Sequence, residues 1–339
     1  MKSTLRKYLR CPGCRGSLTL EVGDVRQTGA PDEVHEGVLR CDQCAEVFAI
    51  RDGIPRMLCA AAPARDAATA RTSARFGYLW VRGPAPLAAT PSPYHFDKMA
   101  RALDLPRYTG VVLDAGCGDG IDLFNHARRG DADVIGVELS DGGCATAYQR
   151  TAGLPRAHVV QADLRRLPFV DATFDAVYSY GVLHHVQSPP AAASELARVV
   201  RPDGPVAVYV YEDFETRAAA LRWALRAVNS LRAITTALPP RVLYRLCQAM
   251  SPVMYFLFAL PHRVLRQFRW THALAFSLPY RHGTGPFNLT GDLYDRFSAP
   301  VEMRYSRRGA VELLANAGLQ VVRDAYDRGW MVYARAARR

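Results

Sequence analysis

Two pairs of cysteines near the start of the chain have the spacing of a metal site. Cys11 and Cys14 form one Cys-X-X-Cys pair, Cys41 and Cys44 form another, and 26 residues separate the two pairs. A β-hairpin spans such a gap and brings four thiolates into a tetrahedron, which suits Zn²⁺. Since four protein ligands fill the shell, we expect a structural zinc ion. The other cysteines are interpreted as small buried residues: Cys59, Cys117, Cys144 and Cys247.

A glycine-rich run, VVLDAGCGDG, is the second group of residues that could do chemistry. After an apolar, β-branched segment it brings Asp114, Gly116, Gly118 and Gly120. Glycines let the backbone turn sharply and approach a ligand without a Cβ in the way. Glu138 ends the next β-branched segment, 24 residues after Asp114, where a carboxylate accepts hydrogen bonds from both hydroxyls of a ribose. Together, the glycine-rich run and the carboxylate of Glu138 predict a site for a nucleoside.

A third carboxylate follows the third β-branched segment. Asp163, in ADLRRLPF, is placed so that its side chain and the amide of Leu164 could hold an adenine ring. A turn or a helix N-cap is the alternative role for an aspartate here. A solvated surface position is the alternative for Glu138, and both alternatives stay open.

The elements that must position these residues alternate between β-branched runs and helical runs, which indicates a parallel sheet flanked by helices. We expect strands at 111–115, 134–138, 158–161, 175–180 and 205–211. Helices are expected at 120–130, 141–152, 190–200 and 307–317. The last helix precedes two strands, 319–325 and 329–335, which are close enough to form an antiparallel hairpin at the sheet edge.

Five motifs, in order, resemble the class I S-adenosylmethionine-dependent methyltransferases, particularly the group of ubiquinone- and menaquinone-biosynthesis enzymes. They are LDAGCGDG, GVELS, ADLRRLPF, FDAVYSYGVLHHV and ELARVVRPDGPVAV, within residues 111–210. The resemblance implies an α/β, Rossmann-like sheet with helices on both faces, and S-adenosyl-L-methionine as cofactor. It implies that Asp114 and the glycines hold the methionine portion. The expected cofactor-binding residues are Asp114, Gly116, Cys117, Gly118, Glu138, Leu139, Asp163, Leu164, Tyr180 and Gly181.

Two positions bear on this resemblance. Asp203 stands in RPDG where the family usually has a second glycine, but it lies in a turn before a strand. A nicotinamide dehydrogenase would need a third glycine three positions after Gly118, and Ile121 stands there. The dehydrogenase interpretation is therefore disfavoured.

The segment VFAIRDGIPRML, at 47–58, resembles the ending of small zinc-ribbon proteins that activate tRNA and protein methyltransferases. The resemblance covers residues 1–58 and implies a packing or substrate-presenting role for a ribbon fused in cis.

Composition divides the chain into five expected parts. They are a zinc ribbon at 1–58, a linker and N-terminal helical segment at 59–110, a cofactor-binding core at 111–211, a helical cap insertion at 212–304 and a C-terminal helix with a strand hairpin at 305–339. The linker is expected at 60–70, AAAPARDAATA, which lacks large apolar residues. In the insertion, PVMYFLFAL is apolar but shorter than the roughly 18 residues of a membrane-spanning helix.

Positive charge is concentrated in the expected insertion. The net charge is +11, and the stretch between Thr216 and Gly291 holds ten arginines and no acidic residue. Such a stretch suits an anionic substrate, a carrier protein, a membrane surface or the phosphates of RNA. With no signal-peptide-like start and no long apolar run, we expect a cytoplasmic protein, and peripheral attachment to a membrane stays open.

Methyl transfer is an in-line displacement that depends mainly on placing the nucleophile about 3 to 3.5 Å from the methyl group, with a base needed only for a protonated acceptor. His185 and His184 follow the fourth expected strand and are our first candidates for that base. Tyr211, followed by Glu212 and Asp213, is the second. Because LHH is common in family members of differing chemistry, a packing role for the histidines stays open.

Three functional hypotheses follow. The first is methyl transfer to a small-molecule or lipid- or carrier-linked biosynthetic intermediate, such as a natural product, a glycan or a quinone-like compound. The second is an rRNA or tRNA methyltransferase that holds RNA with its ribbon and arginine-rich cap. The third is a non-catalytic binding partner, against which the intact set of Asp114, Glu138 and Asp163 argues. The aromatic segments FGYLW and FNLTGDLYDRF flank the expected pocket, with core packing as their alternative role.

Overall fold

The computed structural model describes most of the chain in two compact units. The described residues are 1–26, 33–59, 66–82, 95–105, 108–130 and 132–337. The first unit contains the zinc ribbon, the large sheet and the helices around that sheet. The second, which we call the helical unit, contains Arg217–Pro300. Most of the expected linker, at 60–65, and the proline-rich segment at 84–94 lie outside the described residues.

The ribbon is a four-stranded antiparallel sheet with the strands in chain order. Its strands are β1 (Leu18–Arg26), β2 (Glu33–Cys41), β3 (Val47–Arg51) and β4 (Ile54–Pro55). One cysteine pair precedes β1, and the other begins at the last residue of β2 and ends in the turn before β3, so the β1–β2 hairpin spans the gap between the pairs. This confirms the arrangement expected from the spacing of the cysteines.

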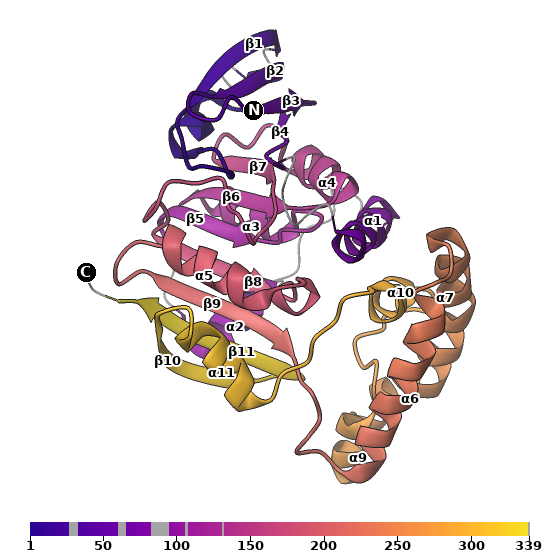
Figure 1. The fold of residues 1–339 in the computed structure, drawn as a ribbon. Helices are drawn as coiled ribbons and strands as arrows, with labels where there is room; N and C mark the ends of the chain where they lie inside the picture. The colour runs from indigo at the N-terminus through magenta and orange to yellow at the C-terminus, as the bar shows by residue number, and fades with distance from the viewer. Residues whose placement is uncertain (27–32, 60–65, 83–94, 106–107, 131, 338–339) are drawn as a thin grey trace. The chain divides into compact units, whose positions relative to one another are not determined.

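The large sheet has seven strands in the order β10-β11-β9-β8-β5-β6-β7 (Figure 1). Its strands are β5 (Gly110–Ala115), β6 (Ala132–Glu138), β7 (Ala157–Gln161), β8 (Ala176–Tyr180), β9 (Pro205–Tyr211), β10 (Leu319–Tyr326) and β11 (Gly329–Ala336). Strands β5 to β9 pair in parallel, whereas β11 is antiparallel to both β9 and β10. The predicted α/β fold, with its C-terminal hairpin at the edge, is confirmed.

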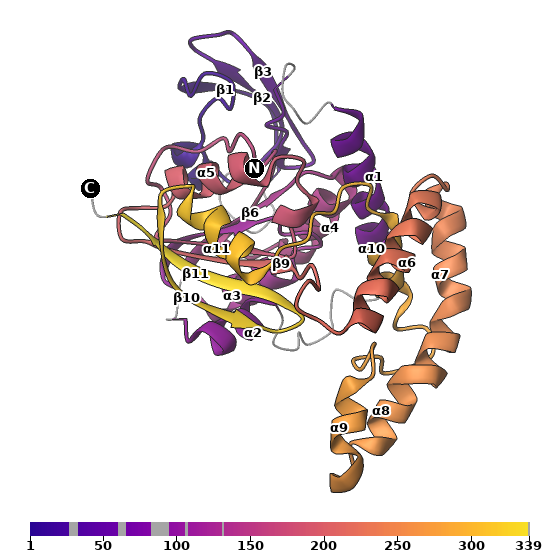
Figure 2. The ribbon, with the colours of Figure 1, turned by 60° about the horizontal axis from the view of Figure 1, so that its bottom comes forward.

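Side chains of each strand alternate between two hydrophobic layers, as the period of a β-strand requires. In β5, Leu113 belongs to the layer that also contains Leu196 and Leu314, whereas Val112 belongs to the layer that contains Leu123 and Met99. The first layer lies under α5 (Pro189–Val199) and α11 (Arg307–Ala315), which share one face of the sheet (Figure 2). The second lies under α2 (His95–Leu103), α3 (Ile121–Arg129) and α4 (Asp141–Thr151).

Strand order reverses at β5, because the chain runs from β5 outward through β6 and β7 and then returns to β8 on the other side of β5. Loops that leave the carboxyl ends of neighbouring strands diverge at such a point and leave a crevice between them. The glycine-rich run follows β5 and therefore lies at this point of the sheet.

Helix α1 (Ala67–Arg82) begins inside the segment expected to be a linker, so the expected boundary at residue 70 is wrong. Alanine favours helices more than any other residue, so an alanine-rich stretch without large apolar residues can still start one. Asp66 caps the helix, since its carboxylate accepts hydrogen bonds from the amide and the hydroxyl of Thr69, both at 2.7 Å.

The ribbon and the large sheet share backbone hydrogen bonds and one hydrophobic core. The amide of Met57 donates to the carbonyl of Gln161 on edge strand β7 at 2.8 Å, and Leu9 forms an antiparallel bridge with Phe169. Leu9 and Phe169 are buried in the same cluster as Leu113 of the central strand. The first unit is therefore one body, in which the ribbon extends the edge and one face of the sheet.

The helical unit has a small core of its own. Its helical segments are α6 (Ala219–Thr235), α7 (Pro240–Met254), η4 (Tyr255–Ala259), α8 (Leu260–Leu265), η5 (Arg269–Thr271), α9 (His272–Ser277) and α10 (Thr290–Ser298). Helix α10 packs against α7 and α6, and α8 packs against α9.

One helix of the described chain, Pro240–Leu265, is long and apolar enough to cross a membrane, judged by length and composition alone. The expectation of only a short apolar run at this place is therefore wrong. Gln248 and Ser251 interrupt the series of apolar residues, but they do not interrupt the helix. The helix continues from α7 through a single π-helical turn into α8.

We predict that the ribbon and the large sheet unfold together, because their core is shared. Phe169→Ala should lower the free energy of unfolding by about 3 to 5 kcal/mol and shift zinc release and sheet opening equally. Both can be followed against temperature, zinc with a chromophoric chelator and the sheet by hydrogen exchange of β5 and β8 peptides. Val322→Ala, on the exposed face of β10, is the control and should change little. Zinc release well below the temperature of sheet opening in the unmodified protein would contradict the shared core.

Candidate cofactor and metal sites

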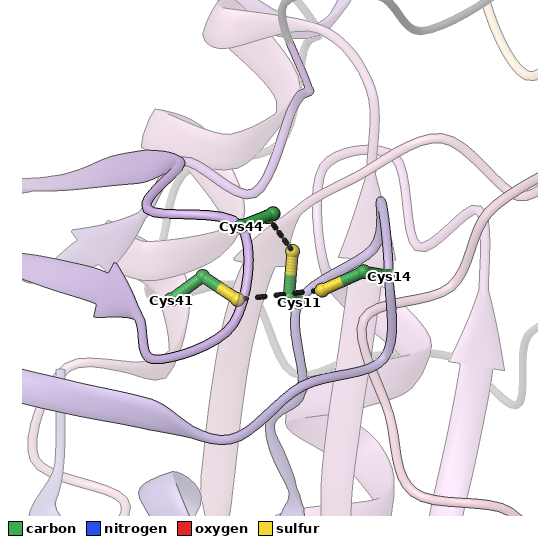
Figure 3. A group of neighbouring side chains, drawn as sticks. All are labelled: Cys11, Cys14, Cys41 and Cys44. Atoms are coloured by element: carbon green, nitrogen blue, oxygen red, sulfur yellow. Dashed lines mark hydrogen bonds between the residues drawn. The ribbon is translucent and has the colours of Figure 1, made fainter.

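The four predicted cysteines gather at one point of the ribbon (Figure 3). The sulfur atoms of Cys11 and Cys44 are 3.7 Å apart, those of Cys14 and Cys41 are 3.4 Å apart, and all four lie within 4.8 Å of one another. Sulfur atoms in tetrahedral Zn²⁺ sites are separated by about 3.8 Å, given a Zn–S bond of about 2.3 Å. The cluster therefore fits one zinc ion with a complete shell of protein ligands.

The conformation and the close packing of the turn between β5 and α3 require glycine at several positions. Gly116, Gly118 and Gly120 all have positive φ angles, of 94°, 54° and 78°. A Cβ at position 116 would lie 2.4 Å from a methyl carbon of Val182, and one at position 118 would lie 3.0 Å from the Trp80 ring. Both side chains therefore approach the backbone of the turn closely.

Asp114, at the end of β5, is buried with an exposed fraction of 3%. No donor among the described residues reaches its Oδ2 atom with hydrogen-bond geometry, although the Tyr178 hydroxyl lies near enough to lower the pKa of the carboxyl group in part. Burial raises the pKa of this carboxyl group well above its ordinary value, and the nearby carboxyl group of Asp122 raises it further. A buried oxygen without a donor is costly, so this position favours a ligand that supplies one.

Glu138, at the end of the neighbouring strand β6, is also buried. One carboxylate oxygen accepts hydrogen bonds from the amide and hydroxyl of Ser140, at 2.9 and 2.6 Å, and the other accepts one from the amide of Gly118 at 3.2 Å. Burial raises the pKa of Glu138, although these hydrogen bonds oppose the shift. Its side chain is thus held in place beside the glycine-rich turn.

Negative charge accumulates around this turn. Asp119 forms an ion pair with Arg150 at 2.8 Å, and Asp122 lies 3.3 Å from the Nδ1 atom of His95. Within the described part of the chain, neither Asp114 nor Glu138 forms an ion pair. The site is therefore suited to a ligand with a positive charge and hydrogen-bond donors, such as an amino group, a sulfonium and ribose hydroxyls.

Asp163 lies past β7 as expected, but its carboxylate is held by a neighbour. Arg165 binds both carboxylate oxygens, with its Nη2 at 2.7 Å, and also reaches Asp66 and the Thr69 hydroxyl, each at 3.3 Å. Asp163 also serves a turn, since its Oδ1 accepts the amide of Arg165 at 2.9 Å. Its adenine-binding role stays a prediction, and the amide of Leu164 is the stronger candidate for that contact.

Helix α1 contributes side chains that the sequence analysis left undecided. Trp80 lies against Gly118, and Phe76 lies between Trp80 and His185, with ring centroids 6.2 and 5.0 Å away. The pair of contacts from Arg165 fixes the start of this helix. The FGYLW motif was the available signal, and the structure places two of its aromatic rings beside the glycine-rich turn and the candidate base.

Tyr180, at the end of β8, lies in a stack of rings. Its ring is 4.5 Å from that of His95 and 4.4 Å from that of Tyr209, and the Nζ atom of Lys98 donates to its hydroxyl at 3.1 Å. Gly181 follows with a φ of 76°. Helix α2 was not expected to contribute site residues, yet it places the basic group of Lys98 beside Tyr180.

The two histidines after β8 occupy different environments. His184 is fully buried, with its ring centroid 3.8 Å from that of Tyr211. His185 retains an exposed fraction of 8%, and its Nδ1 is 2.8 Å from the carbonyl oxygen of Val301. A carbonyl only accepts, so Nδ1 is the donor of this bond, and in the neutral form of the ring the lone pair lies on Nε2. The geometry favours His185 over His184 as a base and favours packing for Tyr211.

The remaining expected residues lie around the same turn. Cys117 is buried next to Gly136, and burial raises the pKa of its thiol, so the side chain stays neutral. Leu139 is half-buried, and its carbonyl accepts a hydrogen bond from Gln161 at 2.9 Å. Of the second-choice polar residues, Glu212 is buried and accepts a hydrogen bond from the Tyr326 hydroxyl at 2.6 Å, which indicates a structural role.

Two protein-family models match the two parts of the first unit. Residues 113–208 match a methyltransferase domain, and residues 2–53 match the Trm112p-like proteins. The chain therefore contains a class I S-adenosylmethionine-dependent methyltransferase domain joined to a Trm112-like zinc ribbon. S-adenosylmethionine and a zinc ion held by the four cysteines are the cofactors of these domains.

Similar proteins align mainly with the methyltransferase domain. The Arabidopsis thaliana phosphoethanolamine N-methyltransferase 3 is 34% identical over 30% of this chain and 21% of its own length. The Methylovorus malonyl-[acyl-carrier protein] O-methyltransferase is 33% identical over 32% and 39%. A complex of the Haloferax volcanii Trm112 methyltransferase activator with a methyltransferase is 14% identical over 71% of this chain and 91% of that one, with a TM-score of 0.42. The chain spans only 28% to 58% of the length of the first curated relatives it matches.

Cofactor binding to this domain should release protons. Burial raises the pKa values of Asp114 and Glu138 above the ordinary carboxyl value of about 4, and a bound cation favours their ionised forms. Affinity for S-adenosylmethionine should therefore weaken as the pH falls through the raised values. Titration calorimetry in phosphate and in Tris, which differ in ionisation enthalpy, measures the protons released. Asp114→Asn should release fewer, and equal heats in the two buffers would contradict the linkage.

Proposed function

We propose that this chain transfers a methyl group from S-adenosylmethionine to a small-molecule or lipid- or carrier-linked biosynthetic acceptor. The observation that carries the proposal is the buried pair Asp114 and Glu138, on adjacent strands beside a turn of three left-handed glycines. The pair fits the ammonium group and the ribose of the cofactor, respectively. Only the Tyr178 hydroxyl lies near the buried Oδ2 of Asp114, and a bound ammonium group would supply this oxygen with a donor of good geometry.

When bound, the cofactor supplies a methyl group on an electrophilic sulfur. The chain's own part is to place an acceptor in line with that group and to exclude water. The rings of Phe76 and Trp80 on one side, and of Tyr180 on another, suit these tasks because they are rigid and largely apolar. His185 would take the proton of a protonated acceptor at its Nε2 atom.

Two relatives support an acceptor of low mass or one attached to a carrier. By name, one methylates phosphoethanolamine and the other a malonyl group on acyl-carrier protein. Both align with the domain that contains Asp114 and Glu138. A natural product, a glycan or a quinone-like intermediate belongs to the same acceptor class.

RNA is the second candidate acceptor. The Trm112-like ribbon and the arginines of the helical unit favour it, since arginines can follow a phosphate backbone. The large exposed apolar side chains among these arginines favour the first candidate, because phosphate contacts do not need them. RNA binding that falls steeply with salt, together with methyl incorporation into RNA, would support the second candidate instead.

His185→Ala should lower turnover at least about tenfold while the affinity for S-adenosylmethionine stays the same. The reason is that this histidine follows β8 at the carboxyl edge of the sheet, with its ring 5.0 Å from that of Phe76. Turnover is followed by formation of S-adenosylhomocysteine with an acceptor found by screening, and affinity by calorimetry.

The matched control is His184→Ala, which removes a buried packing group. It should lower the melting temperature more than His185→Ala does, without a specific change in the pH profile of turnover. Unchanged turnover in a folded His185→Ala protein would remove this residue from the mechanism. Failure of the unmodified protein to turn over any acceptor while binding the cofactor would favour the non-catalytic hypothesis.

A further inference from the structure

The helical unit exposes far more apolar surface than the rest of the described chain. Of the 23 large hydrophobic side chains that are exposed among the described residues, 17 lie in Arg217–Pro300 and six lie in the first unit. Trp270 is 85% exposed, and Trp223, Ile234 and Phe287 are each more than 60% exposed. Single exposed apolar residues are ordinary, but a concentration of this size marks an interaction surface.

The continuous helix Pro240–Leu265 arranges part of this surface as a stripe. Its exposed aliphatic residues recur at intervals of three and four: Val242, Leu246, Met250, Val253, Leu257, Leu260 and Val264. This spacing keeps them on one side of a helix. Their exposed fractions range from 36% to 58%.

The opposite side of the same helix is occupied by the unit's own core. Its buried residues are Leu243, Cys247, Ser251, Tyr255, Ala259 and His262. The hydroxyl of Ser251 donates to the carbonyl of Pro286 at 2.7 Å, and the Nδ1 of His262 is 2.8 Å from the carbonyl oxygen of Ala275. The helix is therefore bound to its neighbours on one side and presents a second apolar side outward.

The positive charge of the helical unit indicates that the partner of this surface is anionic. Residues 217–300 contain eleven arginines and two aspartates, a net charge of +9 out of +11 for the whole chain. Seven arginines are exposed: Arg222, Arg226, Arg241, Arg245, Arg263, Arg266 and Arg269. The guanidinium of Arg226 lies 4.8 Å from the ring centre of exposed Trp223. Arginine beside tryptophan and aliphatic residues is the composition of helices that lie in the interface of an anionic bilayer.

We propose that the helical unit binds the surface of an anionic lipid bilayer, with the stripe Val242–Val264 in the boundary between headgroups and acyl chains and the arginines at the lipid phosphates. The inner side of the helix, with Ser251 and His262 tied to the unit's other segments, excludes a bare spanning helix. RNA would match the arginines but not the aliphatic stripe. The proposal goes beyond the methyl-transfer function and does not depend on it.

Co-sedimentation of the full-length, zinc-loaded protein with vesicles tests the proposal. The probes are vesicles of phosphatidylglycerol with phosphatidylcholine and vesicles of phosphatidylcholine alone. The protein should sediment with the anionic vesicles and bind the neutral ones at least tenfold more weakly. The triple variant Leu246→Glu, Val253→Glu, Leu257→Glu should lose at least tenfold in binding to the anionic vesicles.

The matched control carries three glutamates on the first unit, at positions whose side chains are similarly exposed, as Val22→Glu, Val47→Glu and Val322→Glu. It should bind the anionic vesicles like the unmodified protein. Circular dichroism shows whether the helical unit of each variant is folded, and calorimetry with S-adenosylmethionine reports on the cofactor site separately. A second variant, Arg241→Gln with Arg245→Gln, Arg263→Gln and Arg266→Gln, should weaken binding and flatten its salt dependence.

Three outcomes would overturn the proposal. One is an unmodified protein that stays in the supernatant with anionic vesicles, and another is a stripe variant that sediments as well as the control. The third is a stripe variant that converts a stable dimer into monomers in analytical ultracentrifugation without changing vesicle binding. A second copy of the chain would then be the partner of the stripe. None of these results would bear on cofactor binding, so failure here and failure of the proposed function are distinguishable.

Discussion

The burial of two carboxylates at the point where strand order reverses is the constraint on which the catalytic unit depends. Asp114 and Glu138 are removed from water without a cationic side chain among the described residues to compensate them. A protein retains such costly groups where a ligand supplies the missing charge and donors. The left-handed glycines, the close approach of Val182 and Trp80, and the capping of α1 by Asp66 all organise the space around this pair.

The ribbon belongs to the same physical unit. Its four cysteines hold two knuckles of a small sheet, and the buried residues of that sheet join the core of the catalytic domain through Leu9 and Phe169. On the other side, Arg56 at the end of the ribbon reaches Asp141 and Gln161 next to the Glu138 loop, at 3.2 Å each. Metal binding, folding of the ribbon and the shape of the loop after Glu138 are thereby linked.

The sequence predicts what local patterns can carry. Buried parallel strands are continuous β-branched runs, so β5 to β9 are found within two residues, and the cysteine spacing is enough for the metal cluster. The contact of Arg165 with both Asp163 and Asp66 joins segments about a hundred residues apart and leaves no periodic trace. The start of helix α1 was not predicted, because its alanines are also typical of a linker. The long apolar helix of the second unit was not predicted, because Gln248 and Ser251 interrupt the apolar residues of the sequence without interrupting the helix.

Calorimetric titration of folded, zinc-loaded protein with S-adenosylmethionine and with S-adenosylhomocysteine tests the account most directly. The account predicts that both ligands bind one to one, and that a folded Asp114→Asn, Glu138→Gln double variant gives no binding heat with either. Absence of heat from both ligands with the unmodified protein would contradict it, since the buried carboxylates would then serve no nucleoside cation.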